Sequence, residues 1–200
     1  MRSFFIFNCL LIPLFFVSGK SRLGEYYTGF GFGVVDEATN AFEGDNFNIF
    51  VNSLASEPMD FTFEYSYSGL ETNSSRDTVW ELGVGIRYHF DQFYDNQGMF
   101  RPFLGLGVNY LGDPASLLLE EDGLGWSIEA GAEISFTQSF SFLCFAELYG
   151  LWKDFQYNDF KIHSEFTWWI DEEHGLSVSY LRAVDPKVDY FLFKYLYSWR

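Results

Sequence analysis

Three short stretches of the chain combine residue types that could do chemistry, and the most suggestive is His163-Ser164-Glu165. A serine, a histidine and a carboxylate are the parts of a hydrolytic triad, in which each group must reach the next by a hydrogen bond. In a β-strand neighbouring side chains point to opposite faces, so Ser164 could not meet His163 or Glu165 there. The other two histidines, His89 and His174, are scattered without the spacing of a metal site. We therefore predict no enzyme activity, no catalytic residues, no metal site and no cofactor.

The other two stretches have simpler structural explanations. Gly29-x-Gly31-x-Gly33 has the look of a phosphate-binding loop, but a dinucleotide site needs a helix directly after its glycines, and residues 34–37 lead into a loop. Glu120-Glu121-Asp122 could bind divalent cations, but a solvated acidic loop is the favoured interpretation of these residues. The net charge of −16 argues against nucleic-acid binding, which requires a basic face.

Residues 1–19 have the three parts of a secretory signal peptide: a short basic start, an apolar run from Phe4 to Val17, and the small residues Ser18-Gly19. The apolar run is shorter than the roughly 20 residues that a helix needs to cross a bilayer. We predict cleavage after Gly19. Residues 20–200 then form one domain, in which Cys144 is the single thiol and no disulfide can form.

Alternation of apolar with small or polar side chains dominates the remaining chain. In the segment that begins at Trp126, the apolar residues are Trp126, Ile128, Ala130, Ala132, Ile134 and Phe136, and the residues between them are small or polar. Successive side chains of a strand point to opposite faces, so each such segment has one apolar face. This pattern predicts ten strands, at about 26–35, 46–55, 59–68, 78–90, 100–111, 124–137, 139–152, 159–170, 175–184 and 188–199.

The connections and the two faces indicate how these strands are arranged. Tight turns at 55–58, 137–139 and 171–174 alternate with longer, polar or acidic loops at 36–45, 69–77 and 112–123, which is typical of an outer-membrane barrel. An unbroken apolar band would cause aggregation of a soluble protein, but lipid requires it. The glycine-rich opposite face suits a narrow interior. We predict an all-β fold, a closed antiparallel up-and-down transmembrane β-barrel of about ten strands, with eight as the alternative.

Three segments resemble the family of small outer-membrane β-barrel domains that includes the OmpA and OmpX types. They are Phe100-Arg-Pro-Phe-Leu-Gly-Leu-Gly-Val-Asn-Tyr110, Gly125-Trp-Ser-Ile-Glu-Ala-Gly-Ala-Glu133, and the last strand with Phe191, Phe193, Tyr195, Tyr197 and Trp199. The resemblance covers about residues 25–200, although family members usually have eight strands and end on an aromatic residue rather than on Arg200. It implies a monomer in the outer membrane, in contact with membrane lipid and lipopolysaccharide. It also implies that the insertion machinery reads the last strand.

Charged residues within the strands should point away from the apolar face and into the barrel. They form a predicted lumenal ion network of Glu64, Glu81, Arg87, Arg101, Glu129, Glu133, Glu147, Lys161, Glu165 and Lys194. Counting outward from a tight turn at Gln138 gives three directly opposed pairs: Ser135 with Ser141, Glu133 with Leu143, and Glu129 with Glu147. Two such close carboxylates need a shared proton or a cation, and we expect Arg87 or Arg101 to bridge the last pair. The network either packs and blocks the lumen or forms a gated, proton-sensitive path.

The leading functional hypothesis is a non-enzymatic outer-membrane protein with a structural, adhesive or partner-binding role. The loops at 36–45, 69–77 and 112–123 would carry it, because binding usually resides on loops held by a rigid scaffold. A narrow pore is the first alternative and ranks lower, since charged and aromatic side chains should fill so narrow a lumen. A membrane-embedded lipid hydrolase is the second alternative, for which the sequence shows no site.

Overall fold

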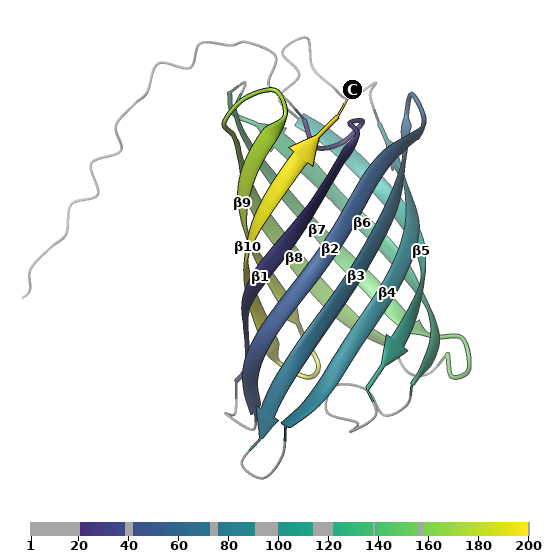
Figure 1. The fold of residues 1–200 in the computed structure, drawn as a ribbon. Coiled ribbons are helices and arrows are strands. Elements are labelled where there is room, and N and C mark those ends of the chain that lie inside the picture. Colours follow the sequence, from purple (N-terminus) through teal and green to yellow (C-terminus); the bar gives the residue numbers. More distant parts are fainter. Residues whose placement is uncertain are drawn as a thin grey trace, which may run out of the picture.

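The fold is a closed barrel, seen in a computed structural model that describes residues 21–38, 42–72, 76–90, 100–113, 122–137, 139–155 and 158–199. Each strand pairs antiparallel with its neighbours in the chain, and β1 closes the barrel against β10 (Figure 1). The described residues form β1 (Tyr27–Glu37), β2 (Phe42–Ser56), β3 (Met59–Thr72), β4 (Arg76–His89), β5 (Phe100–Gly112), β6 (Gly123–Ser135), β7 (Phe140–Leu151), β8 (Asn158–Trp169), β9 (His174–Ala183) and β10 (Val188–Ser198). The ten-stranded prediction is confirmed, and the eight-stranded alternative is wrong. Within the described ranges, no helix has the length and hydropathy to span a bilayer.

The strands are strongly tilted, as Figure 1 shows. Directly paired residues can be followed from Ser135 on β6 through β7 and onward around the barrel. The path returns to β6 at Gly123, near the other end of the same strand. Closing a sheet into a barrel requires such a stagger, because it sets the strand tilt and the width of the interior.

The two ends of the barrel differ. We call the end at Tyr27 and Ser198 the turn end, since the tight β2–β3, β6–β7 and β8–β9 connections lie there, and the opposite end the loop end. At the loop end β1 to β4 extend further than predicted, so the connections expected at 36–45 and 69–77 shrink to 38–41 and 73–75. The outward side chains of the β1 and β2 extensions are acidic, which suggested loops, but the ladder pairing of Asp36 with Glu43 continues through them. Most of the third predicted loop, residues 114–121, lies outside the described residues.

The outer wall is apolar and exposed, while the alternate residues point inward. Leu106 is 67% exposed and Phe32 59%, whereas the inward-facing Phe103 is 1% exposed. This distribution is the reverse of that in a soluble protein and is what a lipid-facing wall requires. The β6–β7 hairpin has the predicted register, with Ser135 opposite Ser141, Glu133 opposite Leu143 and Glu129 opposite Glu147.

The assignment of side chains to the outer face predicts how much a charged residue placed on that face lowers the stability of the barrel. Leu106→Arg should lower the free energy of unfolding from lipid vesicles by about 2–4 kcal/mol, the cost of arginine at the bilayer midplane. Leu124, which is also exposed but lies at the loop-end start of β6, provides the matched control. Leu124→Arg should cost only about 0–1 kcal/mol near the interface. Urea titration of the three proteins in vesicles measures both values, and an unchanged Leu106→Arg variant would mean that the assigned outward face is wrong.

Candidate functional site

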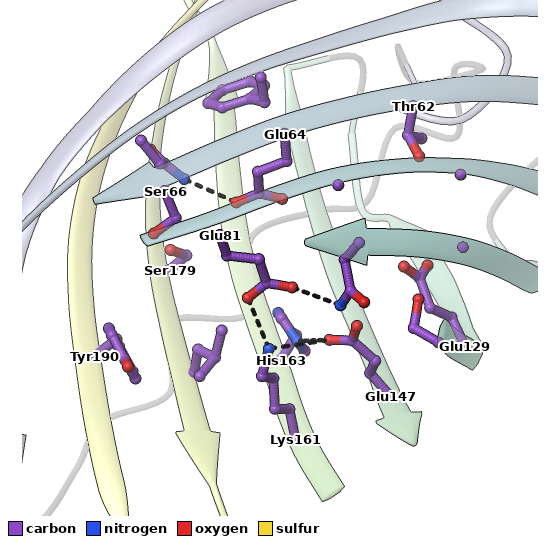
Figure 2. Close-up of a pocket in the computed structure, with 18 of the residues that line it drawn as sticks. Thr62, Glu64, Ser66, Glu81, Glu129, Glu147, Lys161, His163, Ser179 and Tyr190 are labelled. Carbon is purple, nitrogen blue, oxygen red and sulfur yellow. Dashed lines mark hydrogen bonds and ion pairs between the residues drawn. The ribbon is translucent and has the colours of Figure 1, made fainter. Parts of the chain in front are cut away.

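The interior of the barrel is the candidate site, because the charged side chains converge there. A cavity of about 200 Å³ is lined by many members of the predicted ion network: Glu64, Glu81, Arg87, Glu129, Glu147, Lys161, Glu165 and Lys194. Figure 2 shows several of them projecting from opposite walls into the cavity. The other two members, Glu133 and Arg101, are also inside the barrel, but contact the N-terminal segment instead.

The opposed carboxylates of Glu129 and Glu147 do not share one cation. Arg87 Nε donates to Glu129 Oε2 at 2.7 Å. Glu147 Oε2 instead lies 3.1 Å from His163 Nε2 and 4.0 Å from Lys161 Nζ. The choice of Arg87 as a partner is right, but the expected bridge is wrong. Each carboxylate has its own cationic or imidazole partner: Arg87 reaches Glu129 from β4, two strands away, and Lys161 and His163 reach Glu147 from the adjacent β8.

A second set of contacts crosses the barrel toward the loop end. Lys161 Nζ on β8 donates to Glu81 Oε2 on β4 at 3.0 Å, and the other oxygen of Glu81 accepts from Asn109 Nδ2 at 2.9 Å. Figure 2 shows this chain of contacts next to Glu147. The imidazole of His163 stacks on Phe145, with ring centroids 4.1 Å apart. His163 was absent from the predicted network, although it shares the inward parity of Lys161 and Glu165.

Glu165 has three partners among the described residues of the interior. Lys194 Nζ donates to it at 3.0 Å and Ser177 Oγ at 2.6 Å. The guanidinium of Arg22 forms a third contact, an ion pair in which both side chains are almost completely buried. Removing one partner of such a pair is costly, because it leaves a buried charge uncompensated.

Arg22 belongs to an N-terminal segment, Ser21–Glu25, that enters the turn end of the barrel. Ser21, Arg22 and Leu23 are 7%, 5% and 1% exposed. Glu133 binds the segment by accepting from the backbone amide of Arg22 at 2.8 Å and from the hydroxyl of Ser21. Leu23 packs against Phe103 and other apolar residues of the interior. The sequence analysis missed this segment, because it has no alternating pattern.

A buried acid–imidazole pair fixes the exit of the segment from the lumen. His89 Nε2 lies 2.8 Å from Asp60 Oδ2, and both side chains are completely buried. Asp60 also accepts from the amide of Gly24 at 3.0 Å. Gly24 has φ 77°, a left-handed conformation that favours glycine and lets the chain turn into β1. The guanidinium of Arg101 donates to the carbonyl of Leu23, so it serves the segment and not the Glu129–Glu147 pair.

At the loop end an apolar cluster lies inside the barrel. Its buried members come from strands on one side of the barrel and are Val35, Phe42, Leu70, Ala183 and Val188. The interior therefore has a charged middle, a turn end occupied by the N-terminal segment, and an apolar cluster on one side toward the loop end.

The catalytic candidates do not assemble. Ser164 is on the outer wall, where its hydroxyl lies 3.8 Å from the thiol of Cys144, while His163 and Glu165 face the lumen. Among the described residues, no group of three or more histidine, cysteine or acidic side chains could hold a metal ion. The glycines at 29, 31 and 33 lie within β1.

The sequence profile of the family described as the outer membrane protein beta-barrel domain matches residues 8–166, more than half of the chain. Among solved structures, the chain is similar to Neisserial surface protein A, with 11% identity and a TM-score of 0.45, over 88% of this chain and 97% of that one. It is also similar to KdgM porin, with 7% identity and a TM-score of 0.44, over 88% and 99% of the two chains. The N-terminal β-barrel domain of Pseudomonas aeruginosa OprF gives 12% identity and a TM-score of 0.35, over 88% and 98%. No curated protein matches the sequence.

The contacts of Glu133 predict how firmly the N-terminal segment is held. Glu133→Gln removes a charged acceptor from Ser21 and from the amide of Arg22, which should weaken docking by about 1.5–3 kcal/mol. Trypsin should then cut the bond after Arg22 roughly ten times faster or more in the folded protein, as followed by mass spectrometry. The control is Glu129→Gln, which removes a lumenal carboxylate from the same strand. In the natural sequence Glu129 pairs with Arg87 rather than with the N-terminal segment. Equal cleavage rates in all three proteins would show that Glu133 does not hold the segment.

Proposed function

The chain belongs to the outer membrane protein beta-barrel domain family, and from this we propose that it is a non-enzymatic barrel that binds a partner of basic character at its loop end. Outer-membrane barrels place short turns on the periplasmic side and longer loops outside the cell. The loop end would therefore face the exterior. A rigid barrel that holds a binding surface in place is a common arrangement for recognition.

The observation that carries the proposal is a row of carboxylates on the outer surface of the loop end. Asp189, Asp36, Glu43 and Glu71, here called the acidic row, come from the neighbouring strands β10, β1, β2 and β3. Each is directly opposite the next across the strand ladder. Directly opposed side chains have Cβ atoms about 4.5–5.5 Å apart, at which like charges destabilise a sheet.

Arginines neutralise only the two ends of the acidic row. Arg182 Nη1 lies 3.0 Å from Asp189, and Arg76 Nη1 lies 3.7 Å from Glu71. In the described part of the chain, the two central residues Asp36 and Glu43 have no ion-pair partner, and both are exposed. A partner with lysine or arginine side chains would relieve this repulsion, which supports recognition of a basic surface.

The central pair of the acidic row provides the test. Asp36→Asn combined with Glu43→Gln should weaken binding of a decalysine peptide about fivefold or more at low ionic strength, because two unscreened charges are lost. Moderate salt should reduce the difference, since the Debye length is about 10 Å at 0.1 M. Fluorescence anisotropy with purified protein measures both effects. Glu57→Gln combined with Glu172→Gln removes the same charge from the turn end and should change little; an equal loss in that control would contradict the proposal.

A narrow pore is the second candidate, because the central cavity is lined from Arg22 near the turn end to Pro186 near the loop end. The N-terminal segment, which is buried in the turn end, favours a closed lumen. We expect no stable conductance steps in planar bilayers, either for the natural sequence or for Glu129→Gln combined with Glu147→Gln, which should still fold. Conductance steps that change in the double variant would support the gated path and overturn the closed lumen.

A further inference from the structure

One lumenal carboxylate, that of Glu64, differs from the others in its partners. Glu81, Glu129, Glu147 and Glu165 each have a lysine, arginine or histidine within 3.1 Å. Glu133 binds the N-terminal segment, and Asp60 pairs with His89. Among the described residues, the one hydrogen bond of Glu64 comes from Asn48 Nδ2 at 3.1 Å. Although it points into the barrel, Glu64 is exposed, because it faces the open part of the cavity.

The cations around the cavity are already engaged. Arg87 is 2.7 Å from Glu129, Lys161 is 3.0 Å from Glu81 and Lys194 is 3.0 Å from Glu165. Glu165 has a second cation in Arg22, but the described lining still has five carboxylates, Glu64, Glu81, Glu129, Glu147 and Glu165, against the four cations Arg22, Arg87, Lys161 and Lys194. The cavity therefore retains an uncompensated negative charge, which would favour the entry of a positive one.

Two asparagines of the cavity lining bind its glutamates. Asn48 and Asn109 are 3% and 4% exposed, and each uses its amide nitrogen to donate to a glutamate. The amide oxygens of both residues are left buried without a hydrogen-bond partner. Both oxygens lie against the backbone of a neighbouring strand, at Gly31 and Gly125, so the acceptors that a ligand in the cavity can reach are the glutamate carboxylates.

The space in front of Glu64 suits a small ligand. Figure 2 shows Glu64 and Ser66 on one wall, with Ser179, Tyr190 and His163 on the facing walls. The cavity has a volume of about 200 Å³. Aromatic faces such as that of Tyr190 attract cations that have lost their water. Calcium and magnesium, in contrast, require a set of six or more oxygen ligands, and a single free carboxylate does not provide it.

We propose that the lumenal cavity binds a small organic cation with several N–H donors, a guanidinium or a primary ammonium, with Glu64 as its counter-ion. Guanidinium suits the site especially well, because its planar fork donates two parallel hydrogen bonds to a carboxylate. This site is separate from the acidic row and does not depend on the partner proposed for the loop end.

Methylguanidinium and methylurea test the proposal, because they have nearly the same shape and differ in charge. Saturation-transfer NMR on their methyl protons, with full-length protein refolded in the uncharged detergent dodecyl maltoside, reports binding of each. Methylguanidinium should bind saturably and methylurea at least tenfold more weakly. In Glu64→Gln the affinity for methylguanidinium should fall at least tenfold, toward that of methylurea.

Two controls separate this site from other carboxylates. Glu57→Gln, which removes an exposed carboxylate from the β2–β3 turn, should leave methylguanidinium binding unchanged. The variant with Asp36→Asn and Glu43→Gln should also bind normally; a loss there but not in Glu64→Gln would place the site on the acidic row and overturn the proposal. No saturable binding by the natural sequence, or equal binding of the two probes, would overturn it as well. These last two outcomes need no variant, so a folding defect in Glu64→Gln leaves the test intact.

Discussion

The pairing of β1 with β10 is the interaction on which the rest of the structure depends. In hydrocarbon no water is present to satisfy a backbone amide or carbonyl, so a sheet that spans a membrane can have no free edge. Once the edge is closed, the outer wall must be apolar, and polar side chains of the membrane-spanning strands have only the interior available. The exposed leucines and phenylalanines outside and the paired glutamates inside are therefore two consequences of one constraint.

Confinement of the charged side chains makes the interior a packed polar core. A barrel of this width leaves little room beyond its own side chains. Each buried charge is stabilised only if a partner reaches it, which explains the contacts that cross from β8 to β4 through Lys161 and Glu81. The N-terminal segment fits the same requirement, because Arg22 neutralises Glu165 and the amide of Arg22 satisfies Glu133. Glu64 stands out as the position where this compensation is incomplete.

Alternation was sufficient to predict the fold, the inward parity of the charged residues and, with the tight turn at Gln138, the register of Glu129 with Glu147. It could not predict which cation meets which carboxylate, because that depends on distances across the barrel. The strand extensions at the loop end were missed since an acidic outward residue such as Asp36 looks the same in a loop and in a solvated strand. The N-terminal segment was missed because a short aperiodic stretch has no strand signal, and only its contacts reveal its place.

The central claim is that the apolar wall faces lipid and the charged wall faces the lumen. Nitroxide labels placed one at a time along β7, from 142 to 148, test it most directly in lipid vesicles; the label at 144 uses the natural cysteine, and the others use a Cys144→Ala background. Collision with dissolved oxygen, which concentrates in hydrocarbon, should be frequent for labels at Phe142, Cys144, Ala146 and Leu148 and rare at Leu143, Phe145 and Glu147. The opposite alternation, or no alternation along the strand, would contradict the account.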